Sequence, residues 1–167
     1  MNETVLLKLV TFASGVSILT GTGQLFIKNK GWVNYNLSGL FLTIGFLMLQ
    51  DVSVLSGYAA GHHYLTQYHA FLQFCLGPLF YIAYYTVVNP DKEFPRRAYV
   101  LFIPAVIVFL LETTYFFILN RGELYLSSIL SGNKLESPDL IMLCILVAAF
   151  MQNIIYHLYL LAQVLPL

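Results

Sequence analysis

The sequence predicts an all-α fold, a polytopic bundle of about five transmembrane helices with the N-terminus outside. Apolar residues make up 59% of the 167 residues and charged residues only 10%, whereas a soluble domain carries about 25% charged residues. Five segments each offer the roughly 20 mostly apolar residues that a spanning helix needs. The connections between them are mostly short and polar. A soluble chain of this composition would expose large apolar patches, so we expect one transmembrane domain over residues 1–167.

The helices are expected at residues 5–27, 33–57, 68–88, 98–119 and 140–165. The first ends at Lys28-Asn29-Lys30-Gly31, which combines the cations and the glycine that helix C-termini favour. Pro90 and Pro95 prevent a continuous helix between the third and fourth segments. Ser137-Pro138-Asp139 places a proline at an early helical position before the fifth segment.

The lysines and arginines of the connections predict the orientation. The second connection carries none, and the fourth carries only Arg121 and Lys134 among acidic residues. The first and third connections carry the remaining five, which are Lys28, Lys30, Lys92, Arg96 and Arg97. Because cytoplasmic loops are enriched in these cations, the first and third connections are predicted to be cytoplasmic.

One face of the first helix carries small residues. Ala13, Ser17 and Gly21 recur at every fourth position, a spacing that lets helix backbones approach closely in lipid. The alternative is that such residues are simply common in membrane helices. We expect this face to pack against another helix.

Five polar residues are the candidate ligand-binding set. At about 1.5 Å per residue, Lys8 lies roughly 5 Å below the outer end of its helix, Asp51 roughly 9 Å and Glu112 roughly 10 Å. His69 and Gln73 enter the third helix from the same side, at roughly 2 to 8 Å. A carboxylate inside a membrane helix usually faces the bundle interior and has a partner. We therefore expect an outward-facing polar pocket, open to a small ligand or a proton, in which Lys8 or His69 partners Glu112 or Asp51. The alternative is that each group separately reaches the interface.

Metal and cofactor chemistry has little support in the sequence. His62, His63 and His69 could bind a transition metal, but no nearby cysteine completes a site, and an interfacial polar loop is the favoured interpretation. Cys75 and Cys144 lie in apolar runs and are expected to pack as small hydrophobic side chains. No phosphate-binding loop or nucleophile motif is present, so we expect no cofactor, no catalytic residue and no enzyme activity.

Two stretches resemble a known bacterial family. Residues 74–85, Phe-Cys-Leu-Gly-Pro-Leu-Phe-Tyr-Ile-Ala-Tyr-Tyr, resemble its Leu-Gly-Pro-Leu-x-Tyr third helix. Residues 96–104, Arg-Arg-Ala-Tyr-Val-Leu-Phe-Ile-Pro, resemble its His-Phe-x-Pro entry to the fourth helix, with Leu101 in place of the histidine. The family is the membrane-embedded N-terminal sensor region of AraC-type (helix-turn-helix) transcriptional regulators. The resemblance implies a multi-pass protein of the bacterial inner membrane and brings no ligand residues with it.

Two function classes follow. The leading one is a membrane-embedded sensory or signalling module, the N-terminal part of a membrane-bound transcriptional regulator whose DNA-binding domain is absent from this sequence. The alternative is a small transporter or channel subunit with the outward-facing polar pocket. The expected partners are the lipid bilayer, a small-molecule ligand from the outer side and, as an option, further copies of the chain. The formal net charge is zero, and no direct nucleic-acid contact by this segment is expected.

Overall fold

The computed structural model of the chain describes residues 3–28, 31–58, 67–89, 96–117 and 137–164. All regular elements in these ranges are helices, which confirms the predicted fold class. The expected segments 5–27, 33–57, 68–88 and 140–165 lie within three residues of the bounds of four helices, whereas the fourth expected segment, 98–119, is divided. The helices are α1 (Glu3–Leu25), α2 (Trp32–Leu55), α3 (His69–Val88), the 3-10 helix η3 (Arg96–Phe102), α4 (Ile103–Phe117) and α6 (Ser137–Val164).

Within the described ranges, α1, α2, α3 and α6 are the four helices long and apolar enough to cross a membrane. The fourth predicted segment is divided, because α4 has only 15 residues and follows the 3-10 turn of η3. Pro104 has no backbone N–H to donate to Val100, so the α-helical bonding pattern cannot extend back through it. The fourth apolar segment thus approaches the length of a span only when η3 and α4 are taken together.

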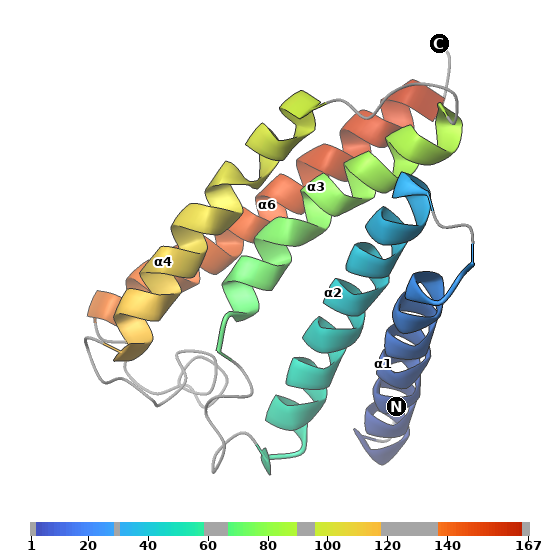
Figure 1. The fold of residues 1–167 in the computed structure, drawn as a ribbon. Helices are drawn as coiled ribbons and strands as arrows, with labels where there is room; N and C mark the ends of the chain where they lie inside the picture. Colours follow the sequence, from blue (N-terminus) through green and yellow to red (C-terminus); the bar gives the residue numbers. More distant parts are fainter. Residues whose placement is uncertain (1–2, 29–30, 59–66, 90–95, 118–136, 165–167) are drawn as a thin grey trace.

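Successive helices run in opposite directions (Figure 1). The ends of α1 and α3 lie on the same side as the C-terminus, and the start of α1 lies on the other side. The end of α1, followed by Lys28, and the start of η3, with Arg96 and Arg97, therefore lie at one end of the bundle, as the orientation prediction requires. Which end faces the cytoplasm stays a prediction.

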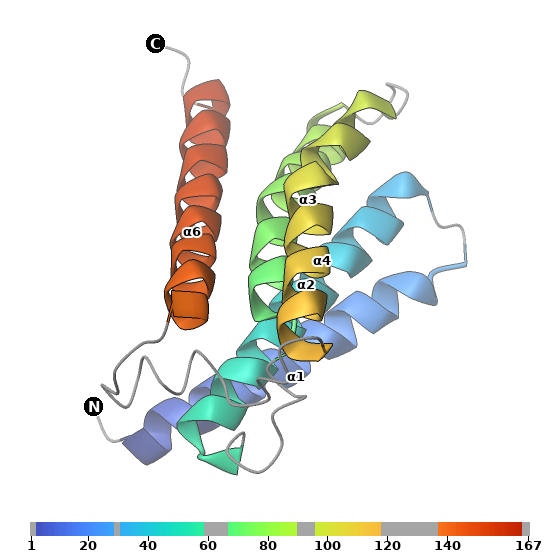
Figure 2. The same cartoon turned by 90° about the vertical axis from the view of Figure 1, so that its left-hand side faces the viewer.

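The central helix is α3. It packs against α2, η3, α4 and α6, whereas the main contacts of α1 are with α2. Figure 2 shows α6 on the far side of α3 from α1 and α2. A movement of α3 would therefore change its contacts with α2, η3, α4 and α6.

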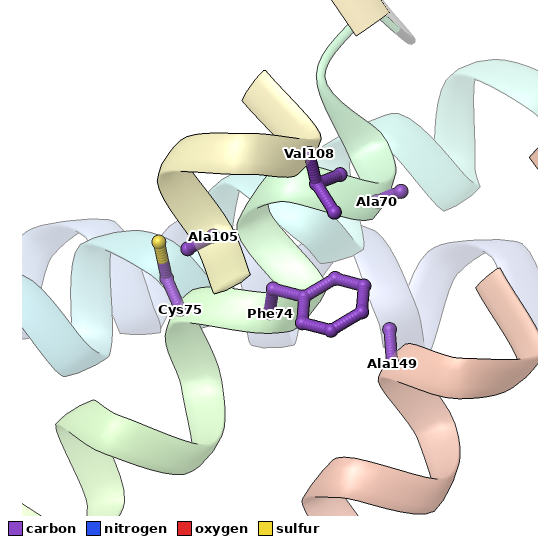
Figure 3. Close-up of a cluster of buried hydrophobic side chains, with 6 residues drawn as sticks. All are labelled: Ala70, Phe74, Cys75, Ala105, Val108 and Ala149. Atoms are coloured by element: carbon purple, nitrogen blue, oxygen red, sulfur yellow. The ribbon is translucent and has the colours of Figure 1, made fainter. Parts of the chain in front are cut away.

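A cluster of buried apolar residues packs α4 and α6 against α3. The Phe74 ring of α3 points toward Ala149 of α6, and the other members of the buried cluster surround it (Figure 3). The cluster consists of Ala70, Phe74, Cys75, Ala105, Val108 and Ala149. Large apolar side chains instead face outward, including Phe12 at 72% exposure and Leu19 at 73%. That distribution is the one expected of a protein whose outer surface meets lipid.

The contact between α1 and α2 uses the predicted small-residue face in part. Gly21 is buried, and a Cβ atom there would come within 3.0 Å of the α2 backbone. Ala13 and Ser17 are only half-buried. Ser14 also lies at the contact between α1 and α2. The Ser14 hydroxyl is buried and donates to the Gly45 carbonyl of α2 at 2.8 Å.

Candidate functional site

The first turn of α3 has no cap from its own side chains. Tyr68 stands at the N-cap position with φ of 66°, in the left-handed region, and its side chain makes no capping hydrogen bond. The first intrahelical bond runs from the Leu72 N–H to the Tyr68 carbonyl. The N–H groups of Ala70 and Phe71 come before this point and need acceptors from outside the helix.

Glu112 of α4 supplies both acceptors. Its Oε1 accepts from the Ala70 N–H at 2.9 Å, and its Oε2 accepts from the Phe71 N–H at 3.0 Å. An N-cap side chain normally accepts from the second or third N–H of its own helix, and here a residue of another helix takes both. The carboxylate also lies at the positive end of the α3 dipole. We call this arrangement the Glu112 clasp: the Glu112 carboxylate with the N–H groups of Ala70 and Phe71.

Aromatic contacts surround the clasp. Phe109 lies one turn before Glu112 on α4 and stacks on Tyr68, with ring centroids 4.9 Å apart and an interplanar angle of 22°. The same ring meets Phe71 edge-on at 5.3 Å. The hydroxyl groups of Thr113 and Tyr68 lie 3.4 Å apart, and the Thr113 hydroxyl donates to the Phe109 carbonyl at 2.7 Å. Residues three and four apart share a helix face, so one face of α4 makes all of these contacts with the start of α3.

The start of α3 is also bonded to α2. The Gln50 Nε2 donates to the Gln67 carbonyl at 2.9 Å, and the Gln50 Oε1 lies 3.0 Å from the His69 Nδ1. A carbonyl can only accept, so the Gln50 amide must direct its oxygen to His69, and the His69 Nδ1 must carry the proton. His69 and Gln50 are buried, at 4% and 8% exposure. Side chains of two neighbouring helices therefore meet at one end of α3.

The structure brings two of the five candidate ligand residues together. His69 and Glu112 both lie at the start of α3, and Glu112 points into the bundle with 3% exposure. Its partners are backbone N–H groups instead of the expected Lys8, His69 or Asp51 side chains. Lys8 is exposed on α1. Asp51 is half-buried on α2 and has no hydrogen bond or ion pair to any residue that the structure describes.

Gln73, the fifth candidate, belongs to the contact between α3 and α6. Asn153 Nδ2 donates to the Gln73 carbonyl at 3.0 Å and lies 3.4 Å from the Gln73 Oε1. Beside it, Gln152 Nε2 donates to the Phe74 carbonyl at 3.0 Å. In an unbroken helix that carbonyl would accept from residue 78, but Pro78 has no N–H. Gln152 supplies the missing donor.

Gln50 and Gln152 were not among the candidates, although each had a signal in the sequence. Gln50 immediately precedes Asp51, at the same polar end of an apolar helix. Pro78, inside a spanning helix, implies a carbonyl in need of a donor four residues earlier, and a neighbouring helix can provide that donor. Neither signal names the partner, because helix rotation is not readable from one sequence.

The histidine alternative lies largely outside the described residues, which do not include His62 and His63. Across the ranges that the structure covers, no group of three or more His, Cys, Asp or Glu side chains is placed to hold a metal ion. His69 Nδ1 is bonded to Gln50. Cys75 and Cys144 are free.

The site therefore consists of a buried carboxylate and a buried imidazole that connect the start of α3 to α4 and α2. Comparison of the chain with protein-family models, with curated proteins and with solved structures found no match.

Proposed function

We propose that this chain is a membrane-embedded sensory module, the N-terminal part of a membrane-bound transcriptional regulator, and that the start of α3 is its sensing site. The observation that supports the proposal is the Glu112 clasp, in which a carboxylate with 3% exposure bonds two backbone N–H groups of another helix. Charged groups inside membrane helices usually mark functional sites. Here the Glu112 carboxylate connects α4 to the start of α3.

The contacts of α3 support transmission of a signal. At its start, α3 is bonded to α2 through Gln50 and to α4 through Glu112. Near Pro78 it is bonded to α6 through Gln152. An input that changes the first set of contacts can shift the helix, and α6 would follow. The C-terminal end of α6 lies at the opposite end of the bundle from the clasp (Figure 1), where a cytoplasmic output domain would be attached under the predicted orientation.

A test of this function measures coupling between the two ends. Spin labels at Val88→Cys and Leu161→Cys, both 54% exposed, report the far ends of α3 and α6 in lipid nanodiscs, in a Cys75→Ala/Cys144→Ser background. A sensor should change the distance distribution between these labels when the clasp is altered by Glu112→Gln. The matched control is Thr114→Val, because Thr114 is exposed and its hydroxyl bonds only within α4, to Leu110.

Two results would count against the proposal. One is an unchanged distribution between the far labels in Glu112→Gln. The other is flux of protons or potassium through proteoliposomes of the wild-type chain that Glu112→Gln abolishes, since a sensor needs no path through the bilayer. That second result would favour the transporter or channel alternative.

A further inference from the structure

The Glu112 clasp is built from one acidic group and two neutral donors. We propose that its ligand is the hydrogen ion: a proton bound by the Glu112 carboxylate displaces one of the two backbone N–H groups and releases α4 from the start of α3. The inference rests on the proposed sensory function and names the input that the site detects.

The chemistry of the carboxylate explains why one proton is sufficient. The ionised group accepts at both oxygens, one N–H to each, from Ala70 at 2.9 Å and from Phe71 at 3.0 Å. When one oxygen takes a proton from hydronium, which leaves as water, it becomes a hydroxyl donor, and only the carbonyl oxygen keeps its full accepting capacity. One N–H then faces a donor, and the attraction between the negative charge and the α3 dipole disappears. The only covalent change is the transfer of this one proton.

In the described ranges, the partners of the Glu112 carboxylate are two neutral N–H groups. Two N–H donors and the positive helix end favour the carboxylate, whereas the apolar bundle disfavours any charge. Among the described residues, no lysine or arginine contacts the carboxylate. A lysine partner would hold the group ionised, as in an ion pair. Because neutral dipoles take that place, the proton is the cation that competes for the site.

Other titratable groups border the clasp and must be separated from it. Among the described residues these are His69, bonded to Gln50, and Tyr68, whose hydroxyl lies 3.4 Å from that of Thr113; Asp51 of α2 follows Gln50 in the sequence. The sequences of η3 and α6 carry further titratable residues, namely Arg96, Arg97, Tyr99, Asp139, Cys144, Tyr156, His157 and Tyr159. His69 is the nearest competitor, because it precedes Ala70 directly.

The experiment follows both the proton and the helix in nanodiscs containing the full chain. Infrared difference spectra between neutral and acidic buffer should show a carboxylic-acid carbonyl band in the wild type that is missing in Glu112→Gln. Spin labels at Leu55→Cys on α2 and Leu111→Cys on α4, both exposed, should move apart over the same pH range. Glu112→Gln should hold the labels in the acid-form distribution at every pH.

Two conservative variants serve as controls. Asp51→Asn removes the other carboxylate of α2 and α4, and it should leave both the band and the pH-dependent movement in place. His69→Gln keeps an N–H donor for Gln50 while removing the imidazole, and it should leave the infrared band of Glu112 present. Loss of the movement in His69→Gln together with its persistence in Glu112→Gln would show that the histidine is the sensor, and it would overturn the inference.

The outcomes distinguish this inference from the proposed function. A wild-type carboxyl band that is the same at all pH values would overturn the proton inference, even if Glu112→Gln still shifted the far labels at Val88 and Leu161. A band and a Leu55–Leu111 movement that titrate together, with no change at the far labels, would sustain the proton site and contradict signalling across the bundle.

Discussion

The hydrogen-bonding capacity of residue 112 should control the stability of the bundle. Any neutral replacement of Glu112 removes both the favourable charge–dipole attraction and the unfavourable burial of a charge. A comparison of two neutral variants cancels these opposing contributions. Glu112→Gln keeps one carbonyl acceptor for the N–H groups of Ala70 and Phe71. Glu112→Met has a similar volume and only a weak sulfur acceptor.

The expected difference follows from the count of unpaired donors. Interhelical hydrogen bonds in membranes contribute about 0.6 kcal/mol on average and about 1.7 kcal/mol at most. A buried donor without any acceptor costs about 1–3 kcal/mol. Glu112→Gln leaves one N–H of the clasp unpaired and Glu112→Met leaves both. We therefore expect the free energy of unfolding of Glu112→Met to be about 1–2 kcal/mol lower than that of Glu112→Gln.

The assay is unfolding of the purified chain by SDS in mixed micelles, followed by circular dichroism at neutral pH. Thr114→Val serves as the control for substitution on α4, and it should change the free energy of unfolding by less than about 0.5 kcal/mol. Equal unfolding free energies for Glu112→Gln and Glu112→Met would refute the reasoning, because the acceptor would then contribute nothing.

Three further predictions concern other contacts. Gln152→Leu should lower the free energy of unfolding by about 1 kcal/mol. In a Pro78→Ala background residue 78 has its N–H again, so a double-mutant cycle should show that most of this effect vanishes. Fully additive effects of the two substitutions would contradict the role of Gln152 as the donor that replaces residue 78. Gly21→Ala should destabilise the chain by about 1–3 kcal/mol because the new methyl group meets the α2 backbone. Gly23→Ala is the control, because Gly23 has open space around it, and it should be neutral or stabilising. If Gly23→Ala proved less stable than Gly21→Ala in thermal unfolding, Gly21 would not lie at the contact between α1 and α2. Lys28→Cys should resist an impermeant thiol reagent applied to intact cells, and a cysteine between α2 and α3 should react; the opposite labelling pattern would invert the orientation.

The sequence predicted the helices well because a spanning helix has a length that the bilayer sets. Apolar runs of that length are conspicuous in a chain with 10% charged residues. The 3-10 start of the fourth segment was not predicted, although Pro104 was visible. A proline shows where α-helical bonding is interrupted, but it does not show whether the chain before it forms a 3-10 turn or a loop.

A sequence can predict the depth of a polar residue along its helix, but not the direction in which its side chain points. Arithmetic along each helix placed Lys8, Asp51, His69 and Glu112 in one shallow layer, since the rise per residue is fixed. Whether they meet depends on which helices are neighbours and how each is rotated, and one sequence contains neither. Lys8 is therefore exposed on α1, while Glu112 finds backbone partners on α3. Backbone groups carry no sequence signature, so a residue-pairing argument cannot anticipate them.

Four of the polar bonds between helices share a form that affects which substitutions the protein can accept. In the bonds made by Ser14, Glu112, Gln152 and Asn153, a side chain on one helix meets a main-chain atom on the other. A substitution in the main-chain partner leaves such a bond intact, unless it introduces proline at a donor, as in Ala70→Pro. Random mutagenesis should thus find that the residue contributing its side chain to the bond tolerates few substitutions. The residue contributing its backbone atom should accept many apolar side chains. The two residues of such a pair would consequently show little correlated variation, and co-variation would miss these four contacts, whereas the side-chain pair of Gln50 and His69 could show it.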